Sequence, residues 1–227
     1  MTTPPASDRS PIALWDAFWS RDAAALPPTP VVAEIVKALG PRIAEARVLE
    51  IGAGTGRDIV ALARAGAAAF ANDRSSAALS RIRERAAAEA VSVEVSDADL
   101  RALPYPDGFF DVVYSVGVVE HFTDVDSVLR EQSRLVRPGG LLVVDVPQTF
   151  NPWTVYKHAC MLFGRWAYGW ETEYSLFDLR RFAKRHGLRV RSVYWWGEHL
   201  TRFKPILDLF DHSPLTAMCI GAVYEKR

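Results

Sequence analysis

Short apolar runs alternate with longer amphipathic segments along most of this chain, and this alternation constrains the fold more than any other feature. Five apolar runs predict buried strands, at residues 46–51, 67–72, 91–96, 110–115 and 141–146. The stretches between them carry the periodicity of amphipathic helices. Strands that alternate with helices in this way predict a parallel sheet with helices on both of its faces.

The last part of the chain has a different pattern. Residues 188–196 and 215–226 alternate apolar and polar side chains and predict two more strands, joined by a short connection. A short connection favours an antiparallel pair at one edge of the sheet. The expected fold class is therefore α/β, a three-layer sandwich whose seven-stranded, mostly parallel sheet has an antiparallel C-terminal strand.

Three helix starts can be predicted from capping residues. Thr29 precedes Pro30 and is a plausible N-cap. Thr123, with an acidic residue three positions later, resembles a capping box. Ser175 begins a third helix, which is expected to run to Gly187.

Composition excludes several classes of protein. The 227 residues are 49% hydrophobic, which is enough for a sizeable core and excludes a disordered chain. Lys and Arg together number 27, as do Asp and Glu, so the net charge is zero. Bulk charge therefore gives no reason to expect binding to a polyanion, and nucleic acid is not an expected partner.

Cysteine use and the N-terminus bear on location. Cys160 and Cys219 lie far apart and form no metal-like spacing, which favours a reducing, cytoplasmic setting. The polar, proline-containing first ten residues do not have the pattern of a signal peptide. No apolar run reaches the ~20 residues that a membrane-spanning helix needs. Contact with a membrane surface and the oligomeric state are left open.

The strongest local motif is the run VLEIGAGTG, from Val48 to Gly56, in which a buried strand leads through glycines into a helix. Glycines let the backbone approach a ligand closely, and a helix N-terminus favours an anionic group. The dinucleotide fingerprint GxGxxG would need a third small residue at position 57, which is Arg57. The spacing found here is instead GxGxG, two residues after Glu50.

This pattern resembles motif I of the class I S-adenosylmethionine (SAM)-dependent methyltransferases, which have a Rossmann-like fold. The resemblance continues through NDRS at 72–75, DLRALP at 99–104, SVGVVEH at 115–121 and RPGG at 137–140. It covers roughly residues 46–147, with the motifs in the family's order. It implies SAM as the cofactor, S-adenosylhomocysteine (SAH) as the product, and methyl transfer to a small organic acceptor.

The resemblance also implies a cofactor site. The implied residues are Glu50, Gly52, Ala53, Gly54, Gly56, Asp73, Arg74, Asp99, Leu100, Ser115 and Val116. Asp73 would bind the two ribose hydroxyls, and Asp99 would accept a hydrogen bond from the adenine amino group. The alternative for Asp73 is an aspartate that only caps the following helix, a role for which Ser75 competes.

Methyl transfer from a sulfonium depends mainly on alignment, and a general base helps when the acceptor must lose a proton. His121 is the first candidate because of its position and near-neutral pKa, and His158 and Tyr174 are weaker ones. A packing or cofactor-contact role for His121 is the alternative. The chain shows no acidic metal-binding set, so no metal is expected.

Acceptor selection is expected in the parts outside the shared core. We divide the single domain into an N-terminal tail and lid helices (1–45), the SAM-binding core (46–147), an aromatic insert that caps the substrate (148–175), and a C-terminal helix with the antiparallel strand pair (176–227). The expected lid and substrate residues are Trp15, Phe18, Trp19, Trp153, Tyr156 and Trp170. Their density favours an aromatic or hydrophobic acceptor. The alternative for the N-terminal helix is that it only packs on the sheet. The alternative for the insert is that its aromatic residues pack against a neighbouring helix or a dimer partner.

Two other functions stay open. One is a nucleotide-binding oxidoreductase with the same strand, turn and helix, and the other is a SAM-binding partner without catalysis.

Charge is unevenly distributed along the chain, because residues 94–126 are strongly acidic while 180–191 are basic. A basic surface beside aromatic residues could meet an anionic lipid or a phosphate-bearing substrate, although such a run is more often a solvated helix face.

Overall fold

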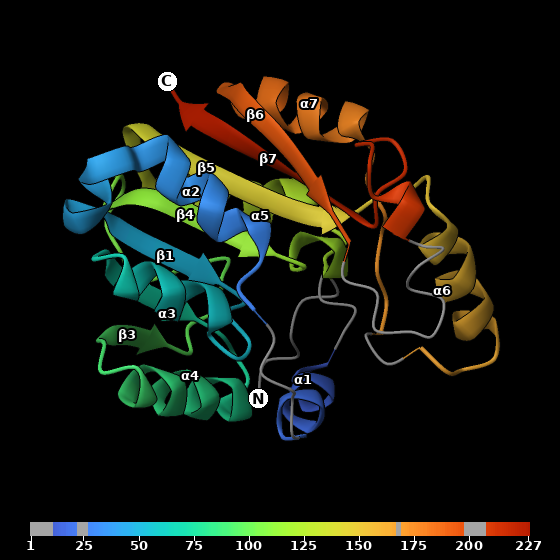
Figure 1. Ribbon diagram of the computed structural model, residues 1–227, viewed down its shortest axis with the longest axis horizontal. Helices are drawn as coiled ribbons and strands as arrows, with labels where there is room; N and C mark the ends of the chain where they lie inside the picture. Colours follow the sequence, from blue (N-terminus) through green and yellow to red (C-terminus); the bar gives the residue numbers. More distant parts are fainter. Residues whose placement is uncertain (1–10, 22–26, 167–168, 198–207) are drawn as a thin grey trace.

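A seven-stranded sheet forms the centre of the protein in the computed structural model, which describes residues 11–21, 27–166, 169–197 and 208–227 (Figure 1). The strands are β1 (Arg47–Ile51), β2 (Ala68–Asn72), β3 (Val93–Ser96), β4 (Phe110–Val116), β5 (Val136–Pro147), β6 (Leu188–Trp196) and β7 (Cys219–Lys226). Their order is β3-β2-β1-β4-β5-β7-β6, and β7 is antiparallel to both of its neighbours. The predicted fold class, including the antiparallel C-terminal strand, is confirmed.

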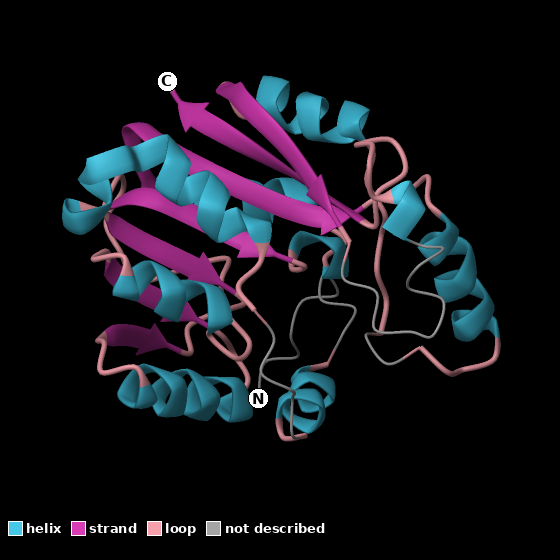
Figure 2. Cartoon of the chain, viewed as in Figure 1, coloured by secondary structure: helices cyan, strands magenta, loops and turns pink. Residues whose placement is uncertain are grey.

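Helices cover both faces of the sheet (Figure 2). They are α1 (Ile12–Trp19), α2 (Pro30–Leu39), α3 (Arg57–Arg64), α4 (Ser76–Ala88), α5 (Val125–Leu135), α6 (Pro152–Leu162) and α7 (Leu176–Arg185), with 3-10 turns η1 (Gly40–Glu45), η2 (Val119–His121) and η3 (Asp208–Phe210). Buried side chains of α2, α3 and α4 pack on one face, and those of α5 and α7 pack on the other.

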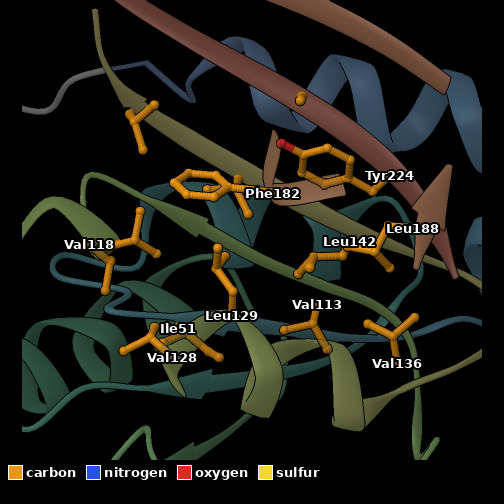
Figure 3. Close-up of a cluster of buried hydrophobic side chains, with 14 of the residues drawn as sticks. Ile51, Val113, Val118, Val128, Leu129, Val136, Leu142, Phe182, Leu188 and Tyr224 are labelled. Carbon is orange, nitrogen blue, oxygen red and sulfur yellow. The ribbon is translucent and has the colours of Figure 1, made fainter. Parts of the chain in front are cut away.

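Alternation along the strands divides the core into two layers. Val48 and Val143 face α2 and α3, while their neighbours Leu49 and Leu142 face α5 and α7. Figure 3 shows the second layer, in which Leu142 lies among side chains from both strands and helices. Because both faces are covered, the central strands are apolar at consecutive positions, which is why the sequence shows them as continuous apolar runs.

The helix starts agree with the capping residues only in part. Ser175 begins α7 as its N-cap, as predicted, and it forms a capping box with Asp178. The cap of α5 is Asp124, whose carboxylate accepts from the Ser127 amide at 3.1 Å, so the prediction of Thr123 was wrong by one residue. Thr29 is the N-cap residue of α2, but its hydroxyl donates to Asp58 at 2.7 Å rather than capping the helix.

Two strand boundaries differ from the predicted ones. β5 begins at Val136, directly after α5, because the RPGG segment is extended and Val136 pairs with Phe110. β7 begins only at Cys219, four residues after the predicted start. The antiparallel pair of β6 and β7 at one edge of the sheet is nevertheless as expected, with β6 outermost and β7 between β5 and β6.

The aromatic insert leaves the sheet and returns to it at one place. The Tyr174 amide donates to the Pro147 carbonyl at 2.9 Å, and the Thr149 amide donates to the Tyr174 carbonyl at 3.1 Å. Between these ends lies α6, which the sequence analysis did not assign as a helix and which stands to one side of the sheet in Figure 1. Asn151 caps it by accepting from the Thr154 amide at 3.0 Å.

Ion pairs connect the basic stretch at 180–191 to acidic side chains of neighbouring elements. Arg185 of α7 pairs with Asp126 of α5 at 2.7 Å, and Arg189 of β6 pairs with Glu225 of β7 at 2.8 Å. These are surface ion pairs, which contribute little to stability individually. Among the residues described, none of the helices combines the length and the apolar character needed to cross a membrane.

Replacing Leu142 by Ala should lower the free energy of unfolding by about 2–5 kcal/mol, because the side chain is fully buried between β5 and the second helix layer. Urea unfolding measures this change. The control is Leu162→Ala on α6, where the side chain is 82% exposed and the expected change is below about 0.5 kcal/mol. Equal losses in both variants would contradict the assignment of the core.

Candidate functional site

The candidate site lies at the carboxyl ends of β1, β2 and β4. The strand order reverses between β1 and β4, which is the place where open α/β sheets bind ligands. The glycine motif forms the turn between β1 and α3, and Gly52 has a positive φ of 68°. A side chain at Gly52 would also collide with Cγ2 of Val118. Both conformation and packing therefore require glycine here.

Asp73 lies just after β2 and faces the glycine turn. Its Oδ2 accepts from the Gly54 amide at 2.9 Å, and its Oδ1 accepts from the Ser75 amide at 2.9 Å. Burial raises the pKa of Asp73. A carboxylate offers about four acceptor positions, so each oxygen can still accept another hydrogen bond. These remaining acceptor positions fit a ligand that donates from two adjacent hydroxyl groups.

Ser75 performs the capping role that was the alternative for Asp73. Its hydroxyl accepts from the Ala78 amide at 3.2 Å and is the N-cap of α4. Asp73 is therefore not the residue that caps α4, and its carboxylate is held beside the glycine turn.

Asp99 is engaged more fully than the sequence suggested. The Arg101 guanidinium donates to both of its oxygens, with Nε 2.8 Å from Oδ1, and the Arg101 amide donates to Oδ1 at 3.0 Å. Arg74 lies 3.7 Å from Oδ2. The Arg101 hydrogen bonds lower the pKa of Asp99. An adenine amino group would share this carboxylate with two arginines.

A buried acidic layer lies beneath the glycine turn. The Glu50 carboxylate accepts from the Ile59 amide at 3.1 Å, which ties the end of β1 to α3. Burial, together with the charge of Asp58, raises the pKa of Glu50 well above its ordinary value. Asp58 is itself held by the amide and the hydroxyl of Thr29, at 2.6 and 2.7 Å.

Asp145 extends this layer under β4 and was not singled out from the sequence. It is 2% exposed on β5, opposite Val116, and accepts from the Trp196 indole at 2.9 Å. Burial raises the pKa of Asp145 to about 7. The sequence feature that could have identified Asp145 is its position as a single acidic residue within an apolar strand.

The remaining expected cofactor residues line the same edge of the sheet. Ser115 is fully buried, with its hydroxyl 3.4 Å from Oε1 of Gln132, and Val116 ends β4. Ala53 and Leu100 are buried in opposite core layers, on either side of the sheet. The structure thus gathers the expected cofactor residues around one switch point.

Helix α1 crosses this edge and carries the predicted lid residues. The Trp19 ring covers the glycine turn, 2.7 Å from where a Cβ on Gly54 would lie. The Trp15 ring packs edge-on against His121, with 4.8 Å between ring centroids. Phe18 packs between the two tryptophans. Figure 1 shows α1 beside α4, beyond the carboxyl ends of the strands.

Polar contacts anchor α1 on α4 instead of on the sheet. Asp16 accepts from the Ser75 hydroxyl at 2.7 Å, and Ser76 and the Ala77 amide lie near the same oxygen. Arg81 donates to the carbonyl of Trp19 at 3.3 Å. Among the described residues no side chain of α1 is fully buried, which does not fit the alternative of a helix docked on the sheet.

His121 lies under this helix. Its Nδ1 is 2.7 Å from the Trp170 carbonyl, which fixes Nδ1 as the donor and leaves Nε2 as the acceptor. Burial lowers the pKa of His121 to about 4. The ring therefore links the loop after β4 to the aromatic insert, and it is a weak base at neutral pH.

The other candidates from the insert are dispersed. Tyr174 packs against Phe182 in the core, and burial raises its pKa. His158 is exposed and 2.9 Å from Glu173. The Trp153 and Tyr156 rings contact each other on α6, whereas Trp170 lies beside His121. Of the expected acceptor-binding residues in the insert, Trp170 reaches the site through the contact of its carbonyl with His121.

Glu120 is a further residue of this edge that the sequence analysis did not select. It is 3% exposed, and its Oε2 has no hydrogen-bond partner within the described part of the chain. Burial and the charge of Glu171 raise its pKa well above the ordinary value. The same described residues contain no cluster of three or more His, Cys, Asp or Glu side chains suited to a metal ion.

The fold and site define an α/β domain with a glycine turn at the switch point of its sheet and an acidic side chain after β2. Residues 49–144 match a family model described as a methyltransferase domain. A Mycobacterium tuberculosis protein named a probable S-adenosylmethionine-dependent methyltransferase is 36% identical over 120 residues, 52% of this chain and 42% of that protein. The malonyl-[acyl-carrier protein] O-methyltransferase of Halorhodospira halophila is 34% identical over 154 residues, 67% of this chain and 48% of that enzyme.

Solved structures show the same fold. The SAH-bound magnesium protoporphyrin IX methyltransferase from Synechocystis PCC 6803 superposes with a TM-score of 0.64 and 19% identity, covering 87% of this chain and 80% of that one. Residues 49–144 thus resemble a methyltransferase domain, and the comparisons support a class I SAM-dependent methyltransferase. The chain spans about half, or less, of the length of the two curated relatives described above.

Asp145→Asn should stabilise the protein above neutral pH. Because the pKa of Asp145 is about 7 in the folded protein, the unfolded chain loses this proton first, and the free energy of unfolding falls as pH rises from about 4 to 7. Asparagine removes this effect and keeps an oxygen that can accept from the Trp196 indole. The gain over wild type should approach roughly 4 kcal/mol as an upper bound at pH 8 and vanish below pH ~4. Unfolding by urea across this pH range measures it. The exposed Asp97→Asn is the control, and a pH-independent difference for Asp145→Asn would contradict the assignment.

Asp16→Asn should loosen α1, because the charged acceptor for Ser75 and the N-terminus of α4 is lost. Hydrogen exchange, followed by mass spectrometry on a peptide covering residues 12–19, should then be faster than in wild type. Ser76→Ala removes only an exposed 3.3 Å contact and should leave the exchange unchanged. Unchanged exchange in Asp16→Asn would show that other contacts hold the helix.

Proposed function

We propose that this protein transfers the methyl group of SAM to a nucleophilic oxygen or nitrogen of a small organic acceptor. The single observation that carries the proposal is the Asp73 carboxylate, fixed by the amides of Gly54 and Ser75 beside a glycine turn at the switch point of the sheet. That arrangement suits the ribose of SAM, and it lies within the residues that match the family model.

The residues proposed to hold the cofactor have distinct tasks. Asp73 accepts the ribose hydroxyls, and the glycine turn from Gly52 to Gly56 admits the methionine portion close to the backbone. The buried carboxyl of Glu50 fixes the position of α3 through the Ile59 amide. Asp99 and the Leu100 backbone meet the adenine edge.

SAM supplies an activated methyl carbon on a positively charged sulfur, so the protein contributes mainly alignment and exclusion of water. Helix α1 supports both tasks, since Trp19 covers the glycine turn and Trp15 contacts His121. These rings favour an aromatic or hydrophobic acceptor, and Trp170 is joined to the same place by the contact of its carbonyl with His121. Acceptor binding next to α1 follows from their position.

Calorimetry with SAH and with NAD separates the proposal from the oxidoreductase alternative. SAH should bind and NAD should not. Radiolabelled SAM with a panel of phenols, quinols and amines then distinguishes catalysis from a binding role. NAD binding without SAH binding would overturn the proposal, and SAH binding without any transfer would favour a non-catalytic SAM-binding protein.

Asp73→Ala should weaken SAH binding by about 1–3 kcal/mol, because buried hydrogen-bond donors lose their partner. Asp99→Ala should weaken it less, since Arg101 already occupies much of that carboxylate. Calorimetric titration gives both values, with the exposed Asp97→Ala as the control. Equal affinity in Asp73→Ala and wild type would remove the ribose assignment.

A further inference from the structure

A buried carboxyl group without a partner lies at the edge of the sheet where acceptor and cofactor would meet. Glu120 belongs to η2, four residues after the end of β4. Its side chain is almost wholly enclosed, yet Oε2 has no hydrogen-bond partner within the described residues. A buried polar atom left unpaired costs about 1–3 kcal/mol, so such an atom calls for a ligand or a function.

The loop that carries Glu120 is held between the glycine turn and the aromatic insert. Val118 packs on Gly52, so closely that a side chain there would collide. The Glu120 carbonyl accepts from the Thr172 amide at 3.0 Å, which joins the loop to the insert. On the other side, Oε1 lies 3.5 Å from where a Cβ on Gly117 would be. The carboxyl group is thus adjacent to the backbone that follows the proposed cofactor residues of β4.

The groups around this carboxyl are mostly acidic. The charged and titratable groups that interact with Glu120 are Glu171 and Tyr174 of the insert, Lys157 of α6, Asp145 of β5 and Cys219 of β7. The Lys157 ammonium is buried and already bound by Glu171, at 3.0 Å, and by Glu173. An acceptor that brings another negative charge would be repelled here, whereas one that donates a hydrogen bond would satisfy Oε2.

Comparison with His121 decides which neighbour is the better base. Burial lowers the pKa of His121 to about 4, and its Nδ1 is committed to the Trp170 carbonyl. Burial raises the pKa of Glu120, while Lys157 favours its ionised form. Glu120 therefore offers a carboxylate oxygen without a partner among the described residues, whereas His121 is already engaged by the insert and has a lowered pKa, which makes Glu120 the better candidate base.

We propose that Glu120 is the catalytic residue that receives the acceptor's proton, and that the acceptor is a hydroxyl or amine compound and not a carboxylate. This inference rests on the proposed methyltransferase function and specifies its substrate class. His121 is then a positioning residue that joins Trp15, the loop after β4 and the insert.

The proton balance of the step is complete. The acceptor's lone pair forms the new bond to the methyl carbon, which leaves its former bonding pair on the sulfur. The proton from the acceptor's oxygen or nitrogen passes to ionised Glu120. The positive sulfonium and the negative carboxylate are both neutralised, so no further reactant is required.

The test uses the full-length protein saturated with SAH, to which phenol, benzylamine or benzoate is added. Phenol and benzylamine should bind and benzoate should not, as measured by saturation-transfer NMR. Glu120→Gln keeps the shape of the side chain but cannot take up a proton, and it should weaken the binding of both by at least about tenfold. The exposed Glu84→Gln on α4 is the matched control and should bind all three as wild type does.

Two further measurements separate catalysis from structure. In single-turnover methylation with labelled SAM, Glu120→Gln should be slowed by at least about 100-fold and lose the acidic limb of the pH–rate profile. Glu120→Asp should recover part of the rate. Independently of activity, Glu120→Gln should raise the thermal midpoint at pH 8 but not at pH 4, because a raised native pKa makes ionisation favour unfolding as pH rises.

The outcomes distinguish the two proposals. Failure of wild type to bind SAH would overturn the proposed function itself. With SAH binding intact, the inference about Glu120 fails if benzoate binds as well as phenol and benzylamine, if neither of those two binds, or if Glu120→Gln matches wild type in fragment binding and rate.

Discussion

The reversal of strand order between β1 and β4 is the constraint on which the rest of this protein depends. Helices must leave the sheet in opposite directions on either side of that point, so the turns after the two strands separate and expose backbone. The glycine turn, Asp73 and the loop carrying Glu120 all stand at this opening. Their proximity follows from topology, although they are distant in sequence.

Charge is distributed around the opening at two depths. Asp73 is held by backbone amides near the surface, where a carboxylate can remain an acceptor. Glu120 and Asp145 lie deeper, and burial raises the pKa of both. A positively charged sulfonium bound at this opening would favour the ionised form of these buried acids.

The local features of the fold could be predicted from sequence, because each depends on neighbours along the chain. The apolar runs give the strands, and the glycine turn and Asp73 follow from short motifs. Glu120 could not be selected in this way. Its surroundings include the charges of Lys157 and Glu171 from the insert, and no pattern within residues 115–121 reveals that these residues lie near it.

Small errors had equally physical causes. Thr123 and Asp124 are both good N-cap residues, and only the backbone direction after η2 favours the second. The engagement of Asp99 with Arg101 is a contact two residues away, but it depends on how the loop after β3 folds back. The resemblance to a known family gave the position of this carboxylate, not its partners.

The backbone pairing of Tyr174 with Pro147 and Thr149 has a consequence for how this protein could change. It closes residues 148–173 into a loop whose two ends are fixed side by side on the sheet. The entropic cost of closing a loop grows only slowly with its length. An insertion or exchange within this segment would therefore leave the strand order and the glycine turn nearly untouched, so the segment can vary in length and sequence without refolding the domain.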